Sequence, residues 1–277
     1  MANFKINAEI AKVYSFAFQQ NQYPLITSLE LSSFKTDPHD KSHKKHSNLK
    51  LVLTSDPEVF SPEEWTIDSL EAGHSVLAQK RLLKISNDYL EGLTELIEIN
   101  LNFTLYLADE VFANQTYQTN LLPKNFWGGE ERMAELLAAF STPNANYISE
   151  LVKKASNVMK AAGHGSGLDG YQSNTRERPY LMAAALWNVI ANESIAYVNP
   201  PTSFAYSGQR IRLPNAIKTH KTGACLDLSL LFSACLEHMG LNPIIALTKE
   251  HACCGFWLID ECFPLLTNDD SMDIRKR

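Results

Sequence analysis

An unbroken alternation of apolar and polar side chains over residues 97–107 (IEINLNFTLYL) is the feature that most constrains the fold of this chain. Successive side chains of a β-strand point to opposite faces, so this pattern predicts a strand with one buried face and one solvated face. Further strands are predicted at residues 25–33, 49–53, 64–67 and 81–85, between turn-forming segments. Several short strands spread over about 100 residues predict an antiparallel β-sandwich.

The periodicity changes at residues 121–129 (LLPKNFWGG), which we take as the domain boundary. Beyond this segment, apolar residues recur at helical spacing in residues 131–140, 147–162 and 180–196. A short helix is also predicted at the start of the chain, residues 3–20, because Ile6, Ile10, Val13 and Phe16 recur at helical spacing.

An almost wholly apolar helix is predicted from Cys225 to Met239, followed by two paired strands at residues 244–247 and 252–259. The chain is therefore expected to be α+β. Residues 1–120 are predicted to form an Ig-like antiparallel β-sandwich led by a short helix. Residues 121–277 are predicted to form a domain in which a helix packs on an antiparallel sheet.

Charge and composition narrow the classes of function. The formal net charge is −6 and no basic stripe is present, which argues against nucleic-acid binding. No apolar run approaches the roughly 20 residues of a membrane span, and the N-terminus lacks a secretory signal pattern. The chain has five cysteines, an odd number without a CxxC pair, which favours reduced thiols in the cytoplasm and argues against zinc.

Two residues in the C-terminal part suggest nucleophilic catalysis. Cys225 opens the apolar helix, and His251 begins the second of the two predicted strands. A helix N-terminus favours the thiolate, the nucleophilic form of cysteine. A histidine delivered from a neighbouring strand can take the thiol proton and return it to a leaving group. The pair therefore predicts a cysteine hydrolase or acyltransferase.

The same residues resemble the transglutaminase-like core, a superfamily that includes transglutaminases, peptide N-glycanases and bacterial cysteine peptidases. The resemblance covers roughly residues 180–265 and is carried by the KTGACLD motif around Cys225, the apolar helix, and Glu250-His251-Ala252. It implies that Cys225 is the nucleophile, that His251 is the general base, and that an aspartate on the next strand orients His251. It implies no metal or organic cofactor.

The aspartate is the point at which the chain departs from that pattern. A returning strand would come level with His251 near Asp269 or Asp270, and Asp269 is the predicted third catalytic residue. However, this segment (NDDS) lacks the apolar alternation of a strand. An acid beyond residue 277, in a longer parent protein, therefore stays open as an alternative.

The β-sandwich together with this core also resembles the N-terminal region of large bacterial proteins that carry helicase and nuclease domains, some of which resemble anti-phage defence factors. Two hypotheses follow. The chain is either a Cys-His-Asp enzyme acting on a protein or peptide amide, or a non-catalytic recognition or scaffolding module. Further domains of the same parent protein are expected partners under either hypothesis.

Three further features carry expectations. Gln209 can donate an amide N–H to an oxyanion, but the expected interpretation is an exposed loop glutamine. Asp227 is expected to satisfy local backbone N–H groups rather than to act on substrate. The glycine-rich residues 163–170 follow a helix instead of a strand, so they predict a helix–helix connection and not a phosphate-binding loop.

Overall fold

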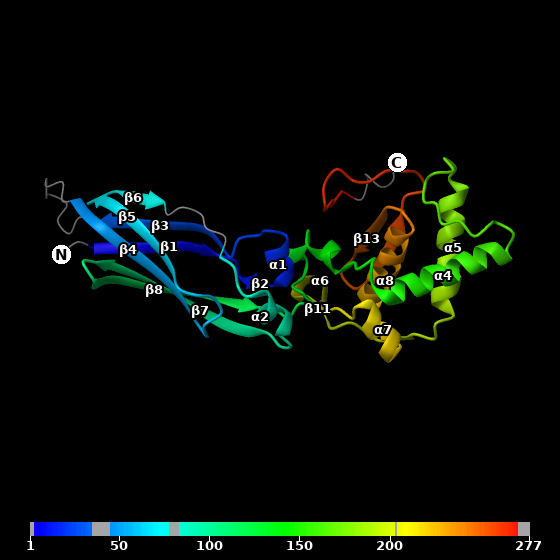
Figure 1. Ribbon diagram of the computed structural model, residues 1–277, viewed down its shortest axis with the longest axis horizontal. Helices are drawn as coiled ribbons and strands as arrows, with labels where there is room; N and C mark the ends of the chain where they lie inside the picture. The colour runs from blue at the N-terminus through cyan, green and yellow to red at the C-terminus, as the bar shows by residue number, and fades with distance from the viewer. Residues whose placement is uncertain (1–2, 35–44, 78–82, 203, 271–277) are drawn as a thin grey trace. The chain divides into compact units, whose positions relative to one another are not determined.

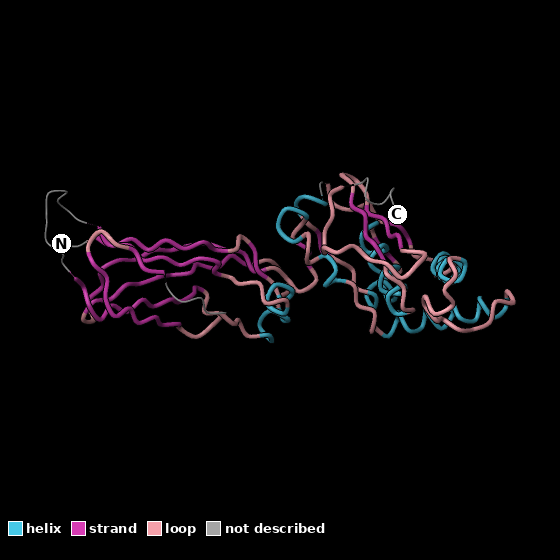
Figure 2. The backbone as a smooth tube through the Cα atoms, turned by 90° about the horizontal axis from the view of Figure 1, so that it is seen from above, coloured by secondary structure: helices cyan, strands magenta, loops and turns pink. Residues whose placement is uncertain are grey.

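The computed structural model describes residues 3–34, 45–77, 83–202 and 204–270. The chain divides into two compact units, Met1–Lys124 and Asn125–Arg277, and this division lies inside the segment 121–129. Strands make up most of the first unit and helices are concentrated in the second, as Figure 2 shows. The chain is thus α+β, with antiparallel and mixed sheets. Each unit is described by itself below.

The described residues of the first unit form two sheets (Figure 1). One is antiparallel, with strand order β1-β3-β6, and consists of β1 (Asn3–Ile10), β3 (Ile26–Phe34) and β6 (Ser75–Leu77). The other has the order β2-β8-β7-β4-β5 and is antiparallel except for its β2–β8 pair. Its strands are β2 (Val13–Tyr14), β8 (Glu110–Leu121), β7 (Ile97–Leu107), β4 (Lys45–Asp56) and β5 (Glu63–Glu71). The part of this unit that the structure describes also has two short helices, α1 (Phe16–Gln20) and α2 (Asn87–Gly92).

The core of this unit follows the alternation seen in the sequence. Leu101, Phe103 and Leu105 of β7 have no exposed surface, and their polar neighbours along the strand are partly exposed. The Tyr117 hydroxyl of β8 joins the two sheets, because it accepts from Ala8 N at 2.9 Å and donates to Ile6 O at 3.0 Å. The strands predicted around residues 25–33, 49–53, 64–67 and 97–107 are confirmed.

Two predictions for the first unit are wrong. Residues 3–10 form strand β1 instead of a helix, and only Phe16–Gln20 is helical in the predicted helix. Of the four residues at helical spacing, only Ile6 and Ile10 lie in β1, and two residues that are four apart share one face of a strand as well as of a helix. Residues 83–85 are not a strand, and residues 81–82 lie outside the described part.

The second unit contains seven helical segments and three small sheets among its described residues. The helices are α3 (Glu130–Met133), the 3-10 turn η1 (Leu137–Phe140), α4 (Asn146–Ala161), α5 (Glu177–Ala191), α6 (Phe204–Ser207), α7 (Pro214–His220) and α8 (Cys225–His238). The sheets pair β9 (Phe126–Trp127) with β11 (Gln209–Arg210), β10 (Ala196–Tyr197) with β12 (Thr222–Gly223), and β13 (Pro243–Leu247) with β14 (Ala252–Phe256).

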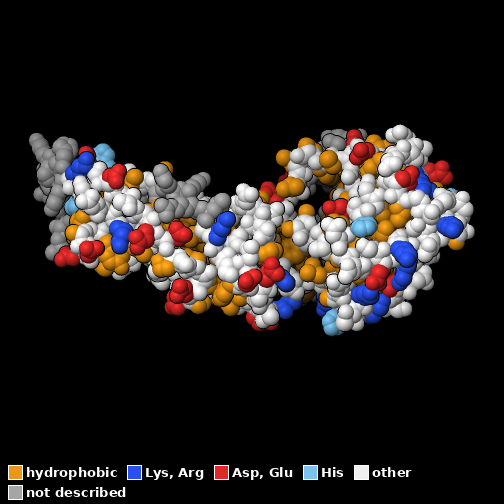
Figure 3. Space-filling model, in the orientation of Figure 1, with side chains coloured by type: hydrophobic (Ala, Val, Ile, Leu, Met, Phe, Trp, Pro, Cys, Tyr) orange, Lys and Arg blue, Asp and Glu red, His pale blue; other side chains and the backbone are white. Residues whose placement is uncertain are grey.

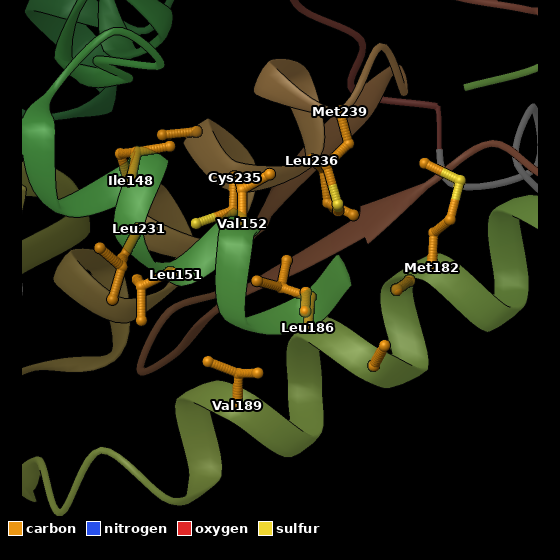
Figure 4. Close-up of a cluster of buried hydrophobic side chains, with 14 of the residues drawn as sticks. Ile148, Leu151, Val152, Met182, Leu186, Val189, Leu231, Cys235, Leu236 and Met239 are labelled. Carbon is orange, nitrogen blue, oxygen red and sulfur yellow. The ribbon is translucent and has the colours of Figure 1, made fainter. Parts of the chain in front are cut away.

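Helix α8 is at the centre of this unit. It packs against α4 and α5 and also against β13 and β14, which explains why it is apolar on nearly every side. Figure 4 shows Leu231, Cys235 and Leu236 of α8 among side chains of α4 and α5, in a cluster of buried residues. The predicted helix on an antiparallel strand pair is therefore confirmed in this coarse form.

Two predicted helices differ from the observed ones. Residues 131–140 divide into α3 and η1, and Met133 O at the end of α3 accepts from the Trp127 indole Nε1 at 2.9 Å and from Leu136 N at 3.1 Å. Helix α5 ends at Ala191, and Ser194 follows with a left-handed φ of 54°.

A charged cluster connects the end of α5 to the segment that leads into α8. Glu193 accepts from Lys221 Nζ at 2.8 Å and from the Tyr147 hydroxyl at 3.1 Å, and it also pairs with Lys154. Burial alone would raise the pKa of Glu193, but these three donors outweigh it and lower that pKa to about 2. Since Lys221 immediately precedes β12, the cluster helps to place the start of α8.

Charges on the surface are mixed. Figure 3 shows acidic and basic side chains interspersed on the described residues of the face that it draws. No helix in the described ranges combines the length and the apolarity needed to cross a membrane.

Candidate functional site around Cys225

Cys225 is the first residue of α8 and is almost fully buried, with 4% of its surface exposed. The helix starts there because the Asp227 carboxylate accepts from the Ala224 backbone N–H at 2.9 Å, a donor that the helix itself cannot satisfy. The thiol therefore belongs to the first turn of an ordered helix of the unit's core.

Asp227 is fully buried and binds two donors in addition to Ala224 N. Its Oδ1 accepts from Arg212 N at 2.8 Å, and its Oδ2 accepts from Arg212 Nη1 at 3.0 Å. The carboxylate thereby attaches the segment after β11 to the first turn of α8. The prediction that Asp227 satisfies local N–H groups is confirmed.

The Tyr197 hydroxyl lies beside the thiol, and the sequence did not reveal this contact. Strand β10 pairs in parallel with β12 so that Tyr197 lies opposite Gly223, and Val198 N donates to Gly223 O at 3.0 Å. This pairing puts the Tyr197 hydroxyl beside both the thiol and the backbone N–H of Cys225. Burial and then the thiol raise the pKa of Tyr197, and the backbone N–H opposes them. A two-residue strand has no periodicity by which the sequence could have shown this contact.

The β13–β14 hairpin, which packs against α8, carries His251 back along the chain from the C-terminal end of that helix. The open end of the hairpin lies at the C-terminal end of α8, where Pro243 pairs with Phe256 and Trp257 N donates to Asn242 O at 3.2 Å. Both strands pack against α8, and because the chain leaves the helix at its C-terminal end, we infer that the hairpin turn lies toward the helix N-terminus. His251 is the last residue of that turn.

The backbone of His251 is well anchored, whereas its side chain is exposed. Thr248 N and Thr248 Oγ1 donate to His251 O at 2.8 and 3.0 Å, and His251 N donates to Thr248 Oγ1 at 3.0 Å. Within the described part of the chain, the imidazole makes no hydrogen bond or ion pair with Cys225 or with a carboxylate. The two predicted catalytic residues thus lie toward the same end of α8 without a direct bond.

The third predicted residue is not placed on a strand. No strand follows Phe256 in the described residues, and Asp269 is exposed in an irregular segment in which Asp270 N donates to Asn268 Oδ1 at 2.8 Å. Asp260 lies at the far end of the hairpin, where its Oδ1 accepts from Asn242 Nδ2 at 3.1 Å. Orientation of His251 by Asp269 or Asp270 stays a prediction.

Gln209 is placed differently from the expected interpretation. It is on strand β11 and is 3% exposed, so the expectation of an exposed loop glutamine is wrong. The sequence could not show this burial, because Gln209 is polar and lies between Gly208 and Arg210. Its burial depends on the tertiary pairing of β11 with β9, in which Gln209 lies opposite Trp127.

A groove of about 720 Å³ lies at the opposite end of α8, next to Tyr171, His238 and Asp260. The glycine-rich residues 163–170 lie in the predicted connection between α4 and α5, and the last three of them, Leu168, Asp169 and Gly170, border this groove. Arg178 closes the connection, since its guanidinium donates to Asp169 Oδ1 at 2.8 Å and to His164 O at 2.7 Å. The groove is thus separate from Cys225.

Among the described residues, no group of three or more His, Cys, Asp or Glu side chains is arranged to hold a metal ion. Comparisons of the chain with protein-family models, with curated proteins and with solved structures find no match.

Proposed function

We propose that residues 125–277 carry a transglutaminase-like, cysteine-dependent acyl-transfer site that acts on a protein or peptide amide. One observation carries the proposal: Cys225 opens the central helix, and the hairpin packed along that helix returns His251 toward the same end. The helix N-terminus favours the thiolate, and the exposed imidazole is free to exchange protons.

In the proposed reaction, Cys225 Sγ attacks the amide carbonyl carbon while His251 takes the thiol proton. The tetrahedral oxyanion collapses, the carbon–nitrogen bond breaks, and His251 returns the proton to the leaving amine. Water or a second amine then attacks the thioester, which gives hydrolysis or transfer. Asp269, Asp270 or an acid beyond residue 277 would hold the imidazole in the required tautomer.

Tyr197 sets a condition on this reaction. Its hydroxyl lies beside the Cys225 backbone N–H, the group that would donate to a substrate oxyanion. A substrate carbonyl therefore has to displace the Tyr197 hydroxyl before Sγ can attack.

A non-catalytic recognition or scaffolding module is the second candidate. The observation that favours it is the burial of Cys225 together with an imidazole that has no carboxylate partner in the described residues. In that case the Cys225 site would be an inactive remnant of the catalytic one.

The pH dependence of alkylation by iodoacetamide separates the two candidates. The full chain is labelled briefly at several pH values, and the modified cysteines are quantified by peptide mass spectrometry. Cys253 and Cys262 are exposed and serve as internal references for thiols without activation, and Cys235 serves as a buried one.

Catalysis predicts that Cys225 is labelled faster than the exposed references below pH 7, and that His251→Ala removes this advantage. An unactivated thiol would instead react mainly at a pH of about 8.5, which is the ordinary pKa of a cysteine thiol. The recognition module is favoured if Cys225 is labelled more slowly than Cys253 and Cys262 at every pH and if the His251→Ala substitution does not change its labelling rate.

A further inference from the structure

We propose that the side-chain amide of Gln209 is the second oxyanion donor of the Cys225 site, an inference that rests on the proposed function. Gln209 is 97% removed from solvent (3% exposed), yet within the described part of the chain neither its Nε2 nor its Oε1 has a hydrogen-bond partner. Buried polar groups are nearly always paired, so an amide with both ends unpaired requires an explanation.

The amide is close in the chain to the start of α8. Gln209 is three residues before Arg212, whose backbone N–H and guanidinium are bound by Asp227 in the first turn of α8. Three extended residues span at most roughly 10 Å, so the Cα atom of Gln209 lies no farther than that from Arg212, the residue that is bound to this turn. Gln209 and Ile211 are both buried while Arg210 between them is exposed, so the glutamine side chain points into the unit.

The backbone that carries Gln209 is rigid. Gly208 has a φ of 83°, and a Cβ built on it would lie 2.1 Å from Trp127 O. Gly129 is packed in the same way, with a Cβ position 2.2 Å from Tyr206 O. Only glycine fits at these two positions, and their close approach holds β9 and β11 together. The unpaired amide is therefore preorganised, as a donor to a transition state must be.

The two unpaired ends match the adduct of an amide substrate. The tetrahedral intermediate presents an oxyanion, which accepts a hydrogen bond, and a nitrogen that carries a proton. Nε2 can donate to the oxyanion together with the Cys225 N–H, while Oε1 can accept from the substrate N–H. Both ends of the amide are then satisfied only when the adduct is bound, which is the condition for selective stabilisation of that state.

Two reactions of the same thiol isolate this role. Acetylation of Cys225 by p-nitrophenyl acetate passes through an oxyanion, whereas alkylation by iodoacetamide does not. Both rates are measured on the full chain for wild type, Gln209→Leu and Gln209→Met, with the Cys225→Ala rate subtracted. The matched control is Gln172→Leu, the same change at an exposed site by the groove at the other end of α8.

The expected result is a loss of about 100-fold or more in acetylation in both Gln209 variants, with alkylation unchanged. Gln172→Leu should leave both rates as in wild type. Since the Gln209 side chain makes no hydrogen bond with the described residues, the leucine variant should fold and resist urea at least as well as wild type, and the methionine variant repeats the test if it does not.

Two outcomes overturn the inference while leaving the proposed function intact. One is unchanged acetylation in the Gln209 variants, and the other is an equal fall of acetylation and alkylation, which indicates a purely structural role. If wild-type Cys225 is alkylated no faster than Cys253 and Cys262, the proposed function fails, and the role of Gln209 fails with it.

Discussion

Replacing Asp227 by alanine should strongly destabilise the second unit. The carboxylate has no exposed surface and binds three donors, namely the backbone N–H of Ala224, the backbone N–H of Arg212 and the Arg212 guanidinium. Asp227→Ala leaves the two backbone N–H groups without their acceptor at the start of α8. The guanidinium is 41% exposed and can be hydrated instead.

The magnitude follows from those contacts. A hydrogen bond to a charged group contributes about 1.5–3 kcal/mol, and an exposed ion pair contributes roughly 0–1 kcal/mol. Removing the carboxylate also removes the cost of burying its charge, so the expected net loss is about 3 kcal/mol. With a urea slope of about 2 kcal/mol per molar, the midpoint of unfolding should fall by about 1.5 M.

Protection of thiols from alkylation is a suitable assay because all the cysteines of the chain lie in the second unit. Unfolding of the first unit therefore does not contribute to the labelling signal. Cys235 is fully buried, and burial together with the neighbouring Cys254 raises the pKa of its thiol to about 12. Cys235 should therefore be alkylated only after unfolding, and its labelling against urea concentration gives the midpoint for this unit.

Arg212→Met is the matched control. It removes only the guanidinium bond and leaves Asp227 with both backbone donors, so the free energy of unfolding should fall by less than about 1 kcal/mol. If Asp227→Ala lowers the midpoint no more than Arg212→Met does, the two backbone N–H groups do not depend on this carboxylate and the reasoning is refuted.

Three further predictions concern other parts of the second unit. The lowered pKa of Glu193 stabilises the folded state above the ordinary pKa of 4.5, and this stabilisation is lost as the pH falls toward 2. The difference in urea midpoint between wild type and Glu193→Gln should therefore become smaller over that pH range. A difference that stays constant would contradict this prediction. Gly208→Ala should cost more than about 2 kcal/mol in the same urea assay, because its Cβ would overlap Trp127 O and its φ is positive. Tyr197→Ala should accelerate alkylation of Cys225 several-fold by uncovering the thiol, Tyr197→Phe should show the part due to the hydroxyl alone, and an unchanged rate in both would show that Tyr197 does not restrict access.

Much of the secondary structure could be predicted because it depends on local pattern. Strand β7 and helix α8 were recognised from residues 97–107 and from the apolar run after Cys225, since the face that each buries determines its periodicity. Strand β1 was mistaken for a helix because its apolar spacing suits both structures. Strand β8 was missed since many of its side chains are exposed, which leaves little alternation to detect.

The candidate site likewise has features that could be predicted from the sequence and one that could not. The position of Cys225 at a helix start and the capping role of Asp227 could be predicted, because both depend on residues within one helical turn. The contact of Tyr197 with Cys225 could not, since it depends on a parallel pair of two-residue strands that are distant in the chain.

By itself, then, the sequence determined where the long strands and the central helix form and which residue opens that helix. The tertiary structure decided what surrounds that residue. It placed Tyr197 over the thiol, buried the amide of Gln209 and joined Arg212 to Asp227, while His251 was left exposed. The physical reason is range: periodicity and capping act within a few residues, whereas the burial and pairing of a single polar side chain depend on segments that meet only when the chain has folded.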